Sequence, residues 1–494
     1  MPSSAPARPK PSRLATRAGA LAVLLALGCA GASASPEHAG SVVVQEGHYA
    51  PTTTGASGGT FVAREAASAD YGGASEEAAY GGADMAAPRA EAAPAMPGSS
   101  ASAPSAPSPA STSATITTTT TVEVTVDSLR VDEPPPRMVQ EQAAPARLLT
   151  AATVGDHDRR GNYLEYLSRH GFEAQRLGLD MTRRVRFRIE DGQGQPVRDA
   201  RIRLRTQWGD VQARTRADGR WDFFPGVDAP NASGPASLIV EAGGRTAELR
   251  VDVPTRGDGQ DVVVRMPGVQ ARHARALDLA FLIDVTGSME DELRYVNREL
   301  TDIVTRVRAE SPETRIRVGA VFYRDRSDSV PLQRIAFTPD VRGFVNAMQS
   351  VHASGGGDYP EDLDAGLDTA VHGLDWSQDD SVKVLVVVAD APPQRYGGFT
   401  YLQAMRESSQ RGIRILPVAA SGADREVEFL FRAMGTYTAA PYVYLTDDSG
   451  IGAPHMEADT DRVAVEYFHD ALTRLLVEDL RGRGMHEPGM FGEG

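Results

Sequence analysis

FLIDVTGSMED, residues 281–291, joins a run of apolar side chains to the acidic start of a helical pattern. Such an apolar run is typical of a strand that is buried on both faces of a parallel sheet. Directly after it, the oxygen-bearing side chains of Asp284, Thr286 and Ser288 fall at alternate positions. Parallel sheets bind ligands beyond the carboxyl ends of their strands, so this stretch predicts a strand that ends at a binding edge.

Apolar runs alternate with amphipathic helical patterns from residue 276 to residue 482. The later strand-like runs are IRVGAVFYRD, VKVLVVVAD, IRILPVAAS and PYVYLTDD. Strands spaced by helices indicate an α/β fold, here a doubly wound, mainly parallel sheet with helices on both faces. We expect this domain to span 276–482.

Two further segments bring oxygen donors to the same edge of the expected sheet. Asp390 ends the run VKVLVVVAD, and the glycine-rich loop GGGDYPED, residues 355–362, supplies Asp358. Oxygen-only ligands suit Mg²⁺, or Mn²⁺ or Ca²⁺, and argue against zinc. The candidate metal ligands are Asp284, Thr286, Ser288, Asp358 and Asp390.

The neighbouring charged residues are better explained by local structure. Asp284 by itself could cap the helix that follows. Glu290, Asp291 and Glu292 fall in the first helical turn, where acidic groups favour the helix dipole. Arg324 and Asp325, in the segment FYRDR, are expected to be structural or to lie at the rim, and no histidine is assigned to a site.

The motif DVTGSM resembles the metal-ion-dependent adhesion site of von Willebrand factor type A domains, usually Asp-x-Ser-x-Ser. FYRDR, GGGDYPEDLDAGL and VVVADAPP add to the resemblance, which covers residues 277–480. It implies that Asp284 and Ser288 bind the metal directly, that Thr286 replaces the first serine, and that Asp390 acts through water.

The middle loop departs from that family, which normally supplies a threonine ligand there. Here the loop offers GGGD, so either Asp358 or Gly357 takes that position. If Asp358 binds, three carboxylates surround one dication, and an acidic residue from a partner becomes less welcome. The resemblance implies a module that binds a protein ligand through its metal ion.

Two other functions are weighed against this one. A scaffold with a structural or inactive metal site has the same sequence features. A metal-dependent hydrolase or phosphatase with an aspartate nucleophile needs a second aspartate where this chain has Thr286, and a lysine near the phosphate. Lys383 begins its strand at the end far from Asp390. The sequence therefore predicts a binding protein that is not an enzyme.

The amino terminus has the pattern of a secretory signal over residues 1–34. Basic residues precede the apolar run 21–27, which is too short to span a bilayer. Cleavage after ASA, residues 32–34, would release the protein. Alternatively, ALGC resembles a bacterial lipobox, and Cys29, the single cysteine, would carry a lipid. Either route predicts an exported protein, secreted or anchored in the cell envelope through that lipid alone.

Composition divides the rest of the chain. Residues 35–150 are rich in Ala, Pro, Ser and Thr and are expected to be a disordered linker. We expect a short helical lead-in over 151–181 and a flexible tail over 483–494. Alternating short runs over 182–267 predict a small antiparallel β-sandwich, resembling immunoglobulin-like repeats, with its arginines on the solvated face. The net charge of −15 argues against a nucleic-acid partner.

Overall fold

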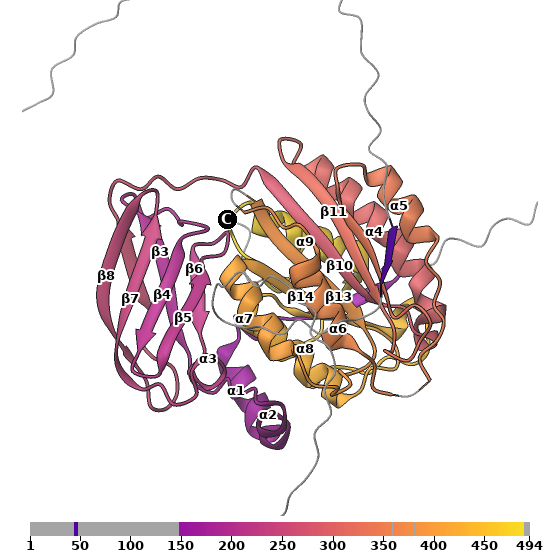
Figure 1. The fold of residues 1–494 in the computed structure, drawn as a ribbon, viewed down its shortest axis with the longest axis horizontal. Helices are drawn as coiled ribbons and strands as arrows, with labels where there is room; N and C mark the ends of the chain where they lie inside the picture. The colour runs from indigo at the N-terminus through magenta and orange to yellow at the C-terminus, as the bar shows by residue number, and fades with distance from the viewer. Residues whose placement is uncertain (1–43, 48–147, 358, 379–380, 489–494) are drawn as a thin grey trace, which may run out of the picture. The chain divides into compact units, whose positions relative to one another are not determined.

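The computed structural model describes residues 44–47, 148–357, 359–378 and 381–488 (Figure 1). The expected signal, Cys29 and Asp358 lie outside these ranges. Among the described residues, no helix is both long enough and apolar enough to cross a membrane.

A nine-stranded sheet is the centre of the α/β region in the described part of the chain. The five central strands pair in parallel, and the strands at both ends of the sheet pair antiparallel. The expectation of a mainly parallel sheet therefore holds for its middle. In spatial order the strands are β1 (Val44–Gly47), β12 (Leu332–Thr338), β11 (Arg315–Tyr323), β10 (Ala276–Asp284), β13 (Ser381–Ala389), β14 (Ile413–Ala419), β15 (Tyr442–Leu445), β2 (Thr150–Val154) and β16 (Val465–Tyr467).

Helices cover both faces of this sheet (Figure 1). Because side chains alternate along a strand, Ala280 and Leu282 of β10 enter one core while Phe281 and Ile283 enter the other. One core includes α1 (Arg160–Arg169), α2 (Gly171–Leu177), α6 (Leu363–Asp368), α7 (Tyr401–Arg411) and α8 (Arg425–Thr438), and the other includes α4 (Glu290–Glu310), α5 (Val341–Gln349) and α9 (Phe468–Leu480). Short helical turns complete the chain: η1 (Gly287–Met289), η2 (Thr369–Gly373) and η3 (Asp447–Ser449).

Residues 182–267 form two small sheets around one apolar core. Along β4, Ile202 and Leu204 are buried while the alternating arginines are exposed, as the sequence pattern predicts. One pair differs from the antiparallel expectation: β3 and β9 run parallel, because the chain reaches β9 by crossing from the other sheet. The elements are β3 (Val185–Asp191), β4 (Arg201–Thr206), β5 (Gly209–Arg214), β6 (Arg220–Phe223), α3 (Pro225–Asp228), β7 (Gly234–Ala242), β8 (Arg245–Val253) and β9 (Val262–Met266).

The segments before the α/β region enter its sheet, against expectation. β1 lies inside the stretch expected to be a disordered linker and pairs with β12. The expected helical lead-in begins instead with β2, which pairs with β15 and β16. Both strands are too short to show a period of their own, so their long-range partners decide their conformation. The rest of 35–150, up to residue 147, lies outside the described residues.

The expected flexible tail is also partly packed. Met485 and His486 are buried, and Glu487 accepts a hydrogen bond from Arg159 at 2.6 Å. These contacts hold the chain after α9 against the loop that follows β2. The tail expectation is therefore wrong for residues 485–487, whereas residues 489–494 are outside the described part.

Candidate metal site

The end of β10 places the alternating oxygens of the sequence motif together. The backbone N–H and the hydroxyl of Thr286 donate to Asp284 Oδ1 at 2.9 and 2.7 Å. Thr286 Oγ1 lies 3.1 Å from Ser288 Oγ. Asp284 and Thr286 are buried, while Ser288 is exposed at the start of the next helical turn. The motif is thus a compact set of oxygens that opens toward solvent at Ser288.

The glycine-rich middle loop lies directly against this motif. Gly287 N donates to Gly355 O at 3.0 Å, and Ser354 N donates to Val285 O at 2.9 Å. Gly356 has a φ of +70°, and a Cβ added there would lie 2.6 Å from Glu361 Oε1. Only glycine fits this backbone and this close approach. The loop is therefore shaped to bring its later residues to the Asp284 edge.

Of the two candidates for the middle-loop ligand, neither is placed at the site by the described residues. Asp358 lies outside them. Gly357 has open space around its Cα, with no atom within 4 Å of an added Cβ. Instead, the loop brings in Glu361, whose side chain is buried beside Gly356. The sequence analysis did not select Glu361. The signal that could have identified it is an acidic residue placed between a glycine-rich loop and an apolar helix.

Three buried carboxylates at this edge each have an oxygen without a hydrogen-bond partner. These atoms are Asp284 Oδ2, Asp390 Oδ1 and Glu361 Oε2. Leaving a buried charged oxygen unpaired is costly, so nearly all such groups in proteins have a partner. A cation at this edge would supply the missing positive charge, directly to some of these oxygens and through water to the others.

The pKa values of these three carboxylates are all raised, as expected where buried acidic groups lack nearby positive charge. Burial raises the pKa of Asp284 above its usual value, and the negative charge of Asp390 raises it further. Burial also raises the pKa of Asp390, against a hydrogen bond from Ser288. Burial and the charges of Asp284 and Asp325 raise the pKa of Glu361 to about 8. Burial is the largest cause of each shift, and the negative charges of neighbouring carboxylates add to it.

The donor set fits a hard divalent cation. Among the described residues, the oxygens of these three carboxylates do not all lie within 4.8 Å of one another. Hydroxyl and water oxygens would therefore complete the coordination, as Mg²⁺ prefers. Asp284, Thr286, Ser288 and Asp390 would hold the ion, with Glu361 as the acidic member from the middle loop.

The neighbouring charged residues support the loops. Arg324 donates to the carbonyl oxygens of Ser354 and His352, both at 2.8 Å, and thereby holds the middle loop. Asp325 accepts from Ser327 N at 2.8 Å and from the Tyr396 hydroxyl at 2.8 Å. Both residues are structural, in agreement with the first of the two roles expected for them.

Glu292 corrects a second expectation. A helix-dipole role predicts an exposed side chain, yet the Glu292 side chain is fully buried and accepts a hydrogen bond from Ser421 N at 3.1 Å. His455 Nε2 lies 2.5 Å from its other oxygen. Glu292 therefore ties the start of α4 to the loop after β14, beside the site. Glu290 and Asp291 are exposed, as a helix-dipole role requires.

A hollow of about 1160 Å³ adjoins the exposed end of the motif. Ser288 lies at its edge, and α4 contributes Arg294, Tyr295 and Arg298 to its lining. Gln349, the last residue of α5, and residues 351–353 after that helix form the other side. The site is thus open on the side where a partner could reach a metal ion.

Comparisons with known proteins identify the domain. Residues 278–454 match the von Willebrand factor A domain, so the chain contains a VWA domain. Over 122 residues it is 27% identical to alpha-protein kinase vwkA of Dictyostelium discoideum, a match covering 24% of this chain and 19% of that protein. Over 117 residues it is 32% identical to putative ariadne-like RING finger protein R811 of Acanthamoeba polyphaga mimivirus, covering 24% and 11%.

A solved structure is similar over part of the chain. It is proximal thread matrix protein 1 from the mussel byssus, at 12% identity and a TM-score of 0.28, with 42% of this chain and 46% of that one covered. The matches cover 19%, 11% and 46% of the length of these three proteins, less than half in each case.

Proposed function

We propose that this protein is an exported binding protein, secreted or lipid-anchored in the cell envelope, that engages a protein partner through a divalent cation in its VWA domain. VWA domains commonly mediate protein–protein interaction, and residues 278–454 form one. The observation that carries the proposal is the group of three unpartnered buried oxygens on Asp284, Asp390 and Glu361.

The cation would be Mg²⁺, or Mn²⁺ or Ca²⁺, because every candidate ligand is an oxygen. An ion held at Asp284 and Ser288 would lie between the buried carboxylates and the hollow beside α4. A carboxylate of the partner would then bind the ion from the open side. Arg294 and Arg298 line that side together with Glu290 and Asp291, so the partner surface would have to place its charges opposite groups of both signs.

A binding role fits the chemistry better than a hydrolytic one. Lys383 pairs in register with Asp278 at the start of β10, and its ammonium group donates to Arg411 O at 3.0 Å. It therefore lies at the opposite end of the strands from Asp390. Phosphoryl transfer with an aspartate nucleophile would need such a lysine beside the phosphate.

Calorimetric titration of Mn²⁺ into the full chain, beside the Asp284→Ala variant, tests the metal site. A fragment starting at residue 270 would lack β2 and its pairing in the sheet, so the full chain is required. We expect one Mn²⁺ to bind the native protein and none to bind at this site in the variant. Equal binding by both proteins would refute the assignment.

The enhancement of water-proton relaxation by the bound Mn²⁺ distinguishes a binding site from a structural one. An ion available to a partner keeps exchangeable water in its open position, and this water should be displaced by a peptide that carries an aspartate side chain. An ion that only stabilises the fold would be enclosed, and chelation would lower the melting temperature without affecting any interaction.

A further inference from the structure

A second cluster of possible metal ligands lies away from the candidate cation site. His157 and Asp158 are in the loop between β2 and α1, and His486 follows α9. Ligand atoms of these three side chains all lie within 4.8 Å of one another. Among the described residues, no other group of three histidine, cysteine or acidic side chains is as tightly gathered. The cluster joins segments that are 328 residues apart in sequence.

The geometry of the cluster suits a metal with nitrogen ligands. His486 Nδ1 lies 2.8 Å from both oxygens of Asp158, and His157 Nε2 lies 3.3 Å from Asp158 Oδ1. Ligand atoms of a tetrahedral zinc ion with bonds of about 2.0 Å are about 3.3 Å apart. A small opening of the His486–Asp158 contact is therefore sufficient to admit an ion.

A backbone carbonyl orients His486 in the way that metal-bound histidines require. Its Nε2 lies 2.8 Å from Arg483 O and can donate a hydrogen bond to it. With that proton on Nε2, a metal ion would replace the proton through which Nδ1 now donates to Asp158, and the Nδ1 lone pair would then face the ion. Metal-bound histidines commonly donate their second N–H to a carbonyl or a carboxylate in this manner.

His157 is the member whose hydrogen bonding is incomplete. Its side chain is buried, and its Nδ1 atom has no hydrogen-bond partner. The imidazole rings of His157 and His486 are tilted by 34° relative to each other, with centroids 5.5 Å apart. Nε2 is the nitrogen that faces Asp158, so Nδ1 is the outer nitrogen, and its missing partner shows that hydrogen bonds alone do not satisfy this buried ring. This missing hydrogen bond is an observation separate from the short distances that identify the cluster.

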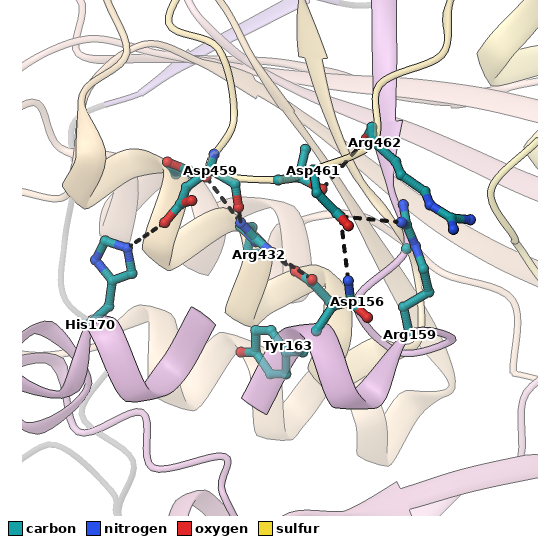
Figure 2. Close-up of polar contacts among 12 residues, drawn as sticks. Asp156, Arg159, Tyr163, His170, Arg432, Asp459, Asp461 and Arg462 are labelled. Carbon is teal, nitrogen blue, oxygen red and sulfur yellow. Dashed lines mark hydrogen bonds and ion pairs between the residues drawn. The ribbon is translucent and has the colours of Figure 1, made fainter. Parts of the chain in front are cut away.

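The loop that carries His157 and Asp158 is held rigidly. Asp156 accepts two hydrogen bonds, each 2.7 Å, from the buried guanidinium of Arg432 on α8 (Figure 2). On the other side, Arg159 donates to Glu487 at 2.6 Å. Both segments of the cluster are thus fixed by ion pairs next to the ligands, which pre-organises the site.

We propose that His157, Asp158 and His486 bind a divalent transition metal of the zinc class, with water as the fourth ligand, and that the ion fastens the segment after α9 to the loop after β2. Two imidazoles and one carboxylate are the donor types that zinc takes when it keeps one open position. This site is separate from the oxygen-only site at Asp284 and takes a different class of metal.

Titration of Co²⁺ into the full chain tests the proposal, because Co²⁺ replaces zinc and its visible absorption reports the coordination number. The Cys29→Ser background removes the single thiol. We expect one equivalent to bind with the intense bands of four- or five-coordinate Co²⁺, and Zn²⁺ to displace it. His486→Ala and His157→Ala should each weaken binding at least about 100-fold, since each removes a direct ligand.

His372→Ala is the matched control, because His372 also lies between two carboxylates, Asp368 at 2.6 Å and Glu407 at 2.5 Å. This variant should bind Co²⁺ as the native chain does. Failure of the native chain to bind, or equal binding by His486→Ala, would overturn the proposal. A loss of thermal stability in His486→Ala without metal binding by the native chain would show a hydrogen-bonded clasp only.

Discussion

The two ligand clusters of this chain differ in their donors and in how the sequence assembles them. The site at the end of β10 uses oxygens alone, and Asp284, Thr286 and Ser288 lie within a single turn. The other cluster combines imidazoles with a carboxylate, and His486 is far along the chain from Asp158. A hard cation such as Mn²⁺ should therefore prefer the oxygen site, and a borderline cation such as Co²⁺ should prefer the cluster with imidazoles. The comparison teaches that candidate ligands can be gathered either by a local motif or by contacts between segments far apart in the chain.

The largest expected effect concerns the buried ion pair that holds the loop carrying His157, compared with an exposed pair. Arg432 contacts Asp156 in a fully buried ion pair and lies 3.6 Å from the centre of the Tyr166 ring. Arg432→Met leaves Asp156 buried and unpaired, so unfolding should become about 3–5 kcal/mol easier. Urea denaturation measures the change.

The control for that prediction is Arg169→Met. Arg169 pairs with Asp459 at 3.0 Å, but both side chains are well exposed. Its removal should cost no more than about 1 kcal/mol. Mn²⁺ binding at Asp284 should survive in both variants. Equal destabilisation by the two changes would contradict the difference drawn between buried and exposed pairs.

The next effect separates the two clusters by metal. Asp284→Ala should weaken Mn²⁺ binding by at least about 100-fold, roughly 2.7 kcal/mol, while Co²⁺ binding at His486 stays within twofold of the native value. His486→Ala should show the reverse. Calorimetry with each metal in each variant gives the four values. If either variant lost both metals equally, the clusters would not be independent.

A pH experiment examines Asp364, a buried carboxylate with a backbone hydrogen bond, for comparison with the carboxylates at the candidate metal site that have an unpartnered oxygen. Asp364 accepts from Tyr401 N at 2.7 Å, yet burial raises its pKa to about 7. The folded protein therefore holds this proton more tightly than the unfolded chain, and Asp364 lowers stability progressively as pH rises from about 4 to about 7.

Asp364→Asn keeps the acceptor for Tyr401 and removes the charge. Relative to the native protein, the variant should be more stable at pH 8 by on the order of 1–3 kcal/mol, with little difference near pH 4. Chemical denaturation at both pH values, with chelator present, measures this. Mn²⁺ binding should be unchanged, and a parallel loss of binding would place Asp364 within the cation site.

The smallest effect concerns the neutral hydroxyl at the open end of the motif. Ser288→Ala should weaken Mn²⁺ binding by about tenfold, or roughly 1.4 kcal/mol, because water can replace a hydroxyl ligand. Ser288→Thr retains the oxygen and should bind nearly as the native chain does. Calorimetry of both variants beside the native chain checks this. If Ser288→Ala bound Mn²⁺ with the same affinity as the native chain, Ser288 would be removed from the ligand set.

The sequence by itself determined the α/β region and the location of its binding edge. Unbroken apolar runs, such as the one ending at Asp284, have no other stable place than a sheet covered on both faces. Because parallel strands end together, Asp284 and Asp390 could be placed at one edge before any coordinates were known. The hydroxyl positions followed from a motif that is local in sequence.

Only the tertiary structure decided the contributions that come from distant or short segments. β2 carries too few residues to show a period, and its place between β15 and β16 depends on partners about 300 residues away. Glu361 reaches the site because glycines let the loop fold back. His157 and His486 meet because α9 and β2 pack together. Local propensity has no information about such contacts, since their energy arises only when the whole sheet forms.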